Sequence, residues 1–259
     1  MKLPRHYVGS RTSTRFLLTT FLITWPAWWL NAVPTSAGII EYSSPIGTAL
    51  HTIGVFGPTI AGLSLIPGGF TPRRGLAFTF GGLRRSLPWT VAFLVVPLVL
   101  LTDASDGLTE GLSPISAMGA FLAALMVSSG NEELGWRAVL EPELERSMPF
   151  SAACLATGAI WGLWYLPLWF TRGAGRETTP FLAFAALAVL LSFWLSALYR
   201  AGGRAFSCCL LHALANTLIG VLSLSSIPLV MAAALALTGL SLAALRYSAP
   251  TRALDRSAC

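Results

Sequence analysis

Charged residues are scarce in this chain of 259 residues, of which Asp, Glu, Lys and Arg together make up 11%. A soluble domain carries about a quarter, so the scarcity excludes an ordinary water-soluble globular protein. Instead, 54% of the residues are hydrophobic, nine are tryptophan, and the mean hydropathy is +0.68. The composition therefore predicts an integral membrane protein, with the lipid bilayer as its immediate partner.

Cysteine is also scarce, and lysine is almost absent. The four cysteines show no CxxC spacing, so we interpret them as small buried apolar residues and not as metal ligands or disulfide partners. Sixteen of the seventeen basic residues are arginine, which favours a GC-rich, bacterial genome as the source.

Long apolar runs are abundant. Eight of them come close to the roughly 20 residues that a helix needs to cross the hydrocarbon core; they cover 15–33, 48–67, 88–104, 114–136, 150–170, 180–199, 205–223 and 226–245. The first run has the basic start and small-residue ending of a signal peptide, but it is too long and too rich in tryptophan for a signal core. We therefore predict an all-α polytopic membrane protein with about eight transmembrane helices in one domain, 1–259.

The basic residues fall on one side of this arrangement. With the N-terminus inside, fifteen of the seventeen lie in inner segments, and only Arg172 and Arg176 lie outside, together with the acidic stretch 103–110. Cytoplasmic loops of membrane proteins carry such an excess. The pattern predicts an inner (plasma) membrane location with both termini cytoplasmic, and it explains the pI near 9.6 without a nucleic-acid partner.

A few ionisable side chains lie within the predicted spans, where their cost normally marks a functional interior. Glu132 and Glu133 lie on the inner part of the fourth span. His212 and Asn216 lie in the seventh, about two turns from its inner end at ~1.5 Å per residue. We therefore expect both pairs at a common depth near the cytoplasmic side.

The spacing of these residues predicts how they face. Glu133 and Arg137 are four residues apart, so they share a helical face and can form an ion pair, whereas Glu132 is turned about 100° away. The same spacing places the side chains of His212 and Asn216 next to each other.

Trp161 and Tyr165 share a face of the fifth span in the same way. Each of these features alone has a simpler interpretation: a solvated pair of glutamates, a packed histidine, or aromatic anchors at the membrane edge. Together, three sites on three helices at compatible depth favour a shared polar cavity.

These residues resemble the motifs of the CAAX protease and bacteriocin-processing family of intramembrane proteases, also called the Abi family. That family carries Glu-Glu-x-x-x-Arg, Phe-x-x-x-His and His-x-x-x-Asn. Here "EELGWR" at 132–137 matches the first motif and "HALAN" at 212–216 the third. The second reads "WGLWY", with Trp161 for the phenylalanine and Tyr165 in place of the histidine. The resemblance covers about residues 115–220.

The resemblance implies hydrolysis of a membrane-associated peptide, prenylated or carrying a leader, with Glu132 as the general base. It implies that Glu133 and Arg137 are the pair that orients the helix. His212 and Asn216 would be the oxyanion or polarising groups. Such a division of roles provides the base and the donors that peptide hydrolysis needs.

The replacement of the second-motif histidine by Tyr165 removes a possible metal ligand. Two histidines and a glutamate would make a plausible zinc set, but besides His212 the chain has only His6, in the N-terminal tail, and His51, near the outer face. We therefore expect no metal and no cofactor. Tyr165 still offers a hydroxyl donor at the position of the missing imidazole.

Two other functions fit the same residues. A catalytically silent relative would bind a membrane peptide as an adaptor, chaperone or immunity protein. A non-proteolytic enzyme would act on an isoprenoid or lipid, a hydrophobic small molecule, with Trp136, Trp161 and Trp164 stabilising a cationic intermediate. The second alternative has no diphosphate–metal site, because the acidic stretch 103–110 is expected outside, away from the glutamates.

Overall fold

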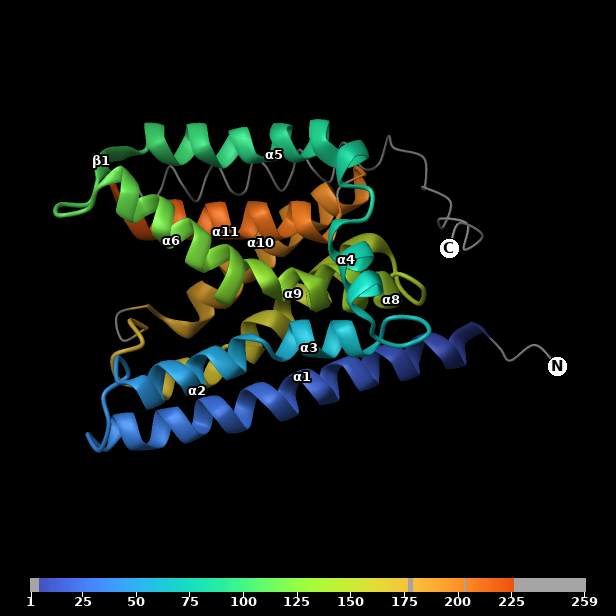
Figure 1. Ribbon diagram of the computed structural model, residues 1–259, viewed down its shortest axis with the longest axis horizontal. Coiled ribbons are helices and arrows are strands. Elements are labelled where there is room, and N and C mark those ends of the chain that lie inside the picture. Colours follow the sequence, from blue (N-terminus) through green and yellow to red (C-terminus); the bar gives the residue numbers. More distant parts are fainter. Residues whose placement is uncertain (1–4, 177–178, 203, 226–259) are drawn as a thin grey trace.

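The computed structural model describes residues 5–176, 179–202 and 204–225 (Figure 1). Its α-helices are α1 (Arg5–Ser36), α2 (Pro45–Val55), α3 (Gly57–Ser64), α4 (Pro72–Phe80), α5 (Leu83–Asp103), α6 (Pro114–Val127), α7 (Glu133–Gly135), α8 (Glu141–Leu144), α9 (Phe150–Trp164), α10 (Phe181–Arg200) and α11 (Ala205–Val221). The remaining elements are the 3-10 helices η1 (Gly130–Glu132) and η3 (Leu166–Phe170), the π-helix η2 (Trp136–Leu140), and strands β1 (Ser105–Leu108) and β2 (Leu222–Leu224).

Among the residues that the structure describes, six helical stretches are long and apolar enough to cross a membrane: Arg11–Ser36, Pro45–Ser64, Ser86–Asp103, Pro114–Leu144, Phe150–Phe170 and Phe181–Arg200. Ala205–Val221 is a further apolar helix, of 17 residues. The all-α polytopic membrane fold that the sequence predicts is confirmed. The expected eighth span, 226–245, lies outside the described residues.

Several helix starts follow directly from the local sequence. Ser44, Thr71 and Ser113 each precede a proline, and each side chain accepts a hydrogen bond from a backbone N–H in the first turn of its helix. These residues satisfy donors that a helix start leaves free, and proline suits the first helical position because it lacks an N–H. The sequence therefore fixes where α2, α4 and α6 begin.

A few helix–helix contacts build the bundle. α1 lies along α2 and α3, α9 packs on α10, and α11 packs on both α5 and α6. Figure 1 shows α1 at one edge of the bundle and α5 at the opposite edge, with α9 and α11 between them. Segments far apart in the sequence therefore meet in the middle of the bundle.

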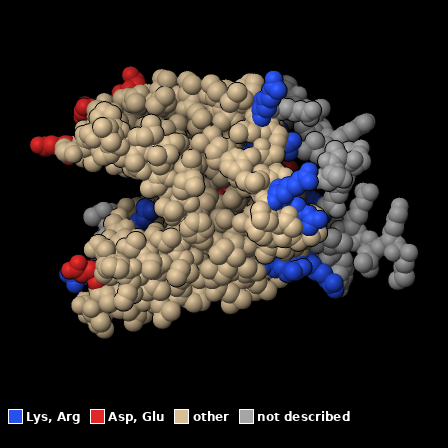
Figure 2. Space-filling view, in the orientation of Figure 1, with Lys and Arg blue, Asp and Glu red and all other residues tan. Residues whose placement is uncertain are grey.

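Charge separates along the long axis of the molecule. Figure 2 shows most of the Arg side chains gathered at the end that holds α4 and α8, while most of the Asp and Glu side chains lie at the opposite end, which includes β1 and also carries Arg172 and Arg176. Between the two ends the visible surface is almost free of charge. The distribution follows the sidedness that the sequence predicts, and the orientation in the membrane stays a prediction.

Candidate active site

The two glutamates follow a break in the fourth predicted span. α6 ends at Val127, and Ser128 leaves the helical conformation with φ −136° and ψ −126°. The Asn131 side-chain amide donates to the Met126 carbonyl at 3.1 Å, so it satisfies an acceptor at the end of the helix. The Thr59 hydroxyl on α3 donates to the Asn131 carbonyl at 2.8 Å. The span predicted over 114–136 therefore lies within the helical stretch Pro114–Leu144, which is interrupted after Val127.

Beyond the break, the chain forms three short helical segments with an increasing number of residues per turn. η1 is a 3-10 helix, α7 is one short α-helical turn, and η2 is a π-helix; such π segments are rare and often mark functional sites. Gly135 allows α7 to touch α3, since a Cβ there would lie 2.4 Å from the Pro58 carbonyl oxygen. This close approach holds α7, and with it the two glutamates, against α3.

Glu132 is fully buried and fixed by two donors from the fifth span. Trp161 Nε1 donates to Oε2 at 2.8 Å, and the Tyr165 hydroxyl donates to Oε1 at 2.6 Å. Trp161 lies on α9 and Tyr165 is the residue after its end. The carboxylate is thus held at both oxygens by the pair of residues that departs from the family's second motif.

Glu133 contacts a different helix. Its Oε1 lies 2.8 Å from His212 Nδ1, and its Oε2 lies 3.4 Å from Arg137 Nε. Asn216 Nδ2 lies 3.3 Å from His212 Nε2. Because a carboxylate only accepts, Nδ1 donates to Glu133, and Nε2 is left to accept from the Asn216 amide. The imidazole is therefore held at both nitrogens.

Arg137 connects this cluster to α10 through two residues that sequence reasoning missed. Its Nε lies 3.6 Å from Glu141 Oε2, and the Ser196 hydroxyl donates to that same oxygen at 2.5 Å. Its guanidinium carbon lies 5.6 Å from the centre of the Trp161 ring. The four-residue step from Arg137 to Glu141 was a usable signal, but no pattern linked Glu141 to Ser196 on another helix.

The structure therefore brings together all six residues singled out from the sequence, from η1, α7, η2, the end of α9 and α11. Glu132 and Glu133 face different neighbours, as their adjacent positions predict. His51 lies elsewhere, with its ring stacked 5.7 Å from that of Trp28. Within 5–176, 179–202 and 204–225, no three His, Cys, Asp or Glu side chains are grouped as metal ligands.

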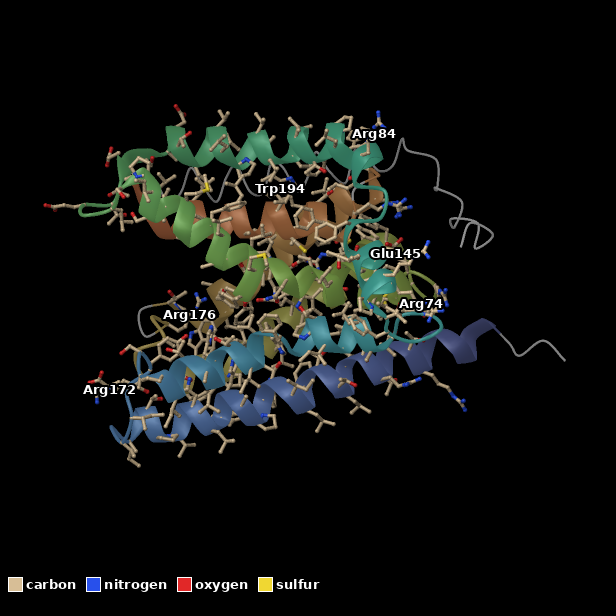
Figure 3. The ribbon with its side chains drawn as sticks, viewed as in Figure 1. Arg74, Arg84, Glu145, Arg172, Arg176 and Trp194 are labelled. Atoms are coloured by element: carbon tan, nitrogen blue, oxygen red, sulfur yellow. The ribbon has the colours of Figure 1, made fainter. Side chains whose placement is uncertain are left out.

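A cavity of about 600 Å³ lies beside the cluster. Its lining includes four of the residues described above: Trp161, Tyr165, His212 and Asn216. The other lining residues are mainly apolar side chains of α5, α10 and α11, together with Asp103, Arg176 and Thr179. Figure 2 shows a notch at the acidic end of the molecule, and Figure 3 shows Arg176 inside the outline of the bundle there.

The position of Asp103 corrects one expectation. We expected the acidic stretch 103–110 to lie away from Glu132 and His212, but Asp103 lines the same cavity as His212. The reason is that α5 packs along α11, so the end of α5 borders the space next to the site. The cavity thus joins the cluster to the acidic end of the molecule.

Comparison with known proteins identifies a related family. Residues 113–218 match a family model described as Rce1-like, type II CAAX prenyl endopeptidase. No curated protein matches the chain. The matched segment includes the whole cluster, from Glu132 to Asn216, together with the helices α9 and α10 that line the cavity.

Proposed function

We propose that the chain belongs to the intramembrane protease family whose Rce1-like, type II CAAX prenyl endopeptidase model matches residues 113–218, and that it hydrolyses a membrane-associated peptide with Glu132 as the general base. The observation that carries the proposal is the pair of donors on the Glu132 carboxylate, placed beside a cavity large enough for several side chains. Burial of a carboxylate is costly, so a fold that keeps one and orients it supports a chemical role.

The reaction is assigned to His212 and Asn216, which line the cavity, and to Glu132, which is buried and contacted by the lining residues Trp161 and Tyr165. Each Glu132 oxygen has two acceptor positions and uses one, so the carboxylate can still take a proton from water. The resulting hydroxide attacks the carbonyl carbon of the peptide, and Glu132 then gives the proton to the leaving amine. One amide N–H of Asn216 donates to His212, and the other can donate to the oxyanion. His212, held by Glu133, orients Asn216.

Carbocation chemistry on an isoprenoid or lipid is a weaker second candidate. It needs tryptophan faces that are open to the substrate, but Trp136 and Trp164 are completely buried. Of the three tryptophans considered, Trp161 lines the cavity, and its N–H is bonded to Glu132. A silent adaptor remains the main competitor, and a Glu132 variant distinguishes it, as described in the Discussion.

The first test concerns Tyr165, where the chain departs from the family motif. Its hydroxyl donates to the proposed base, and its ring lies 5.5 Å from that of Trp28 and 5.3 Å from that of Phe184. Tyr165→Phe removes a hydrogen bond to a charged group, worth about 1.5–3 kcal/mol, so cleavage of a membrane-anchored peptide should fall roughly 10- to 100-fold. Tyr165→His should also lower it, because the smaller ring leaves the pocket unfilled.

Tyr199→Phe is the matched control, since Tyr199 lies on α10 and is not among the residues that line the cavity. Its cleavage rate should equal that of the wild type. If Tyr165→His cleaves faster than the wild type, the histidine of the family motif is the better residue at this position. That result would contradict the role proposed for the Tyr165 hydroxyl.

A second test concerns sidedness. Because fifteen basic residues fall on one predicted side, reporter fusions at Arg84 and Arg204 should both read as cytoplasmic, and a fusion at Gly107 should read as external. Gly107 lies in β1 and borders the acidic end of the molecule. In this orientation the notch at the acidic end faces the external side, so we propose that the peptide enters from there. An external signal at Arg204 would rule out this orientation.

A further inference from the structure

Arg137 lies between two carboxylates. Its Nε lies 3.4 Å from Glu133 Oε2 and 3.6 Å from Glu141 Oε2, and both distances are longer than the roughly 2.7–2.9 Å of a direct hydrogen bond between a cation and a carboxylate. All three side chains are buried. The position of the guanidinium therefore depends on the balance between the attractions of two carboxylates, and not on one tight bond.

One of these carboxylates is fixed by a serine of α10. The Ser196 hydroxyl lies 2.5 Å from Glu141 Oε2 and 2.6 Å from the Ser192 carbonyl oxygen. A hydroxyl has one hydrogen to donate. The carbonyl already accepts a backbone N–H within α10, whereas a bond to the carboxylate is charge-assisted, so the hydrogen goes to Glu141. Ser196 thus favours the charged form of Glu141, which attracts Arg137.

The other carboxylate holds an imidazole at the cavity wall. Glu133 Oε1 lies 2.8 Å from His212 Nδ1, and His212 Nε2 lies 3.3 Å from Asn216 Nδ2. His212 and Asn216 line the cavity, whereas Glu141 and Ser196 do not. A continuous set of contacts therefore connects a buried serine of α10 with the groups that face the substrate.

The charge of Glu141 acts on His212 through this set of contacts. Without that charge, the guanidinium moves toward Glu133, because the attraction between unit charges grows as they approach and is screened little in a buried site. A carboxylate that is neutralised by a closer Arg137 accepts more weakly from the Nδ1–H of the imidazole. The proton then also occupies Nε2, and the Asn216 amide loses its acceptor.

We propose that Glu141, fixed by Ser196, is a positioning residue for the hydrolysis. It draws the Arg137 guanidinium away from Glu133 and so keeps the proton of His212 on Nδ1. The inference rests on the function proposed above, in which the imidazole orients the donor for the oxyanion. A residue pair from α8 and α10 thereby controls the order of a site that is built on α7 and α11.

The first test is kinetic. Glu141→Gln keeps the length of the side chain and an acceptor for Ser196, but it removes the charge. The kcat for a membrane-anchored peptide should fall about 2- to 30-fold, the range for changes that act on a site through intermediate contacts. KM should not change, since Glu141 does not line the cavity. Ser196→Ala should lower kcat by a smaller factor. The double variant should be about as slow as Glu141→Gln alone, because both changes act through one contact.

Ser192→Ala is the matched control. Ser192 lies one turn before Ser196 on α10 and is also completely buried. Its hydroxyl donates to the Cys154 carbonyl at 2.9 Å. The substitution therefore removes one buried hydrogen bond from the same helix and leaves the ion pairs intact, so kcat should equal that of the wild type.

The second test observes His212 directly and needs no substrate. In protein labelled with ¹⁵N-histidine, the nitrogen chemical shifts show which ring nitrogen carries the proton, and the signals of His212 are those lost in His212→Gln. The wild type and Ser192→Ala should show the proton on Nδ1. Glu141→Gln should show shifts that move toward the form with the proton on Nε2.

Failure of this inference differs from failure of the proposed function. An unchanged kcat in Glu141→Gln, or equal losses in Ser196→Ala and Ser192→Ala, would overturn the positioning role and leave the hydrolase standing. A lower kcat with unchanged His212 signals would also overturn it, because the effect would not pass through the imidazole. No cleavage by the wild type would overturn the proposed function, while the His212 signals would still test the positioning role.

Discussion

Glu132→Gln is expected to lower peptide cleavage at least about a hundredfold, the lower end of what a general base contributes, while the protein stays folded. Glutamine keeps the shape of the side chain and cannot take a proton from water. It offers one acceptor in place of two, so Trp161 Nε1 can keep its acceptor while the Tyr165 hydroxyl rotates to accept from the new NH₂ group. The loss of rate would therefore report chemistry and not unfolding.

The same variant separates the two main functions. An adaptor or immunity protein would bind its membrane peptide equally well with either side chain and would give no cleaved product. The measurement is product formation and peptide binding, side by side, for wild type and variant. Glu145→Gln is the control, since Glu145 is partly exposed and paired with Arg200 at 3.3 Å, outside the cavity. Full activity in Glu132→Gln would eliminate the mechanism.

Arg137→Met is expected to lower the free energy of unfolding by about 3–5 kcal/mol, because removing one partner of a buried ion pair leaves the other charge uncompensated. Arg137 is completely buried and pairs with both Glu133 and Glu141. Methionine occupies a similar length and supplies no charge. Denaturant unfolding in detergent micelles should show the loss, and His212 should lose its orientation together with Glu133.

Arg146→Met provides a comparison that differs mainly in burial. Arg146 pairs with Glu143 at 3.3 Å, and 44% of its side chain is exposed, so its loss should cost about 0–1 kcal/mol. Adding Glu141→Gln to Arg137→Met should recover part of the stability, since the double variant removes one of the stranded carboxylates. Equal effects of Arg137→Met and Arg146→Met would show that the buried cluster contributes no special stability.

The parts of the site that local spacing determines were predictable from the sequence. Four-residue steps predicted the Glu133–Arg137 ion pair and the contact between His212 and Asn216, since both depend only on the winding of one helix. Membrane composition predicted the apolar helices for a similar reason, because a spanning segment must satisfy its own backbone.

Contacts between helices were not predictable in the same way. The sequence placed Trp161 and Tyr165 on one face, but which glutamate they meet depends on how α9 is rotated against α7. The bond from Ser196 to Glu141 joins residues 55 positions apart. The turn-forming residues "SSGN" after Val127 were a local signal of the break. We did not predict the break because these residues lie within a long apolar run.

The interrupted span Pro114–Leu144 also has a consequence for how the protein is made. It carries Glu132, Glu133, Arg137 and Glu141, and translocon-insertion measurements put the cost of a charged residue at the centre of a lone helix at about 2.5–3.5 kcal/mol. The partners that offset this cost, Trp161 to Asn216 along the chain, are synthesised later. This span therefore stays beside the translocon, or reaches its depth late, until α9, α10 and α11 emerge to receive it.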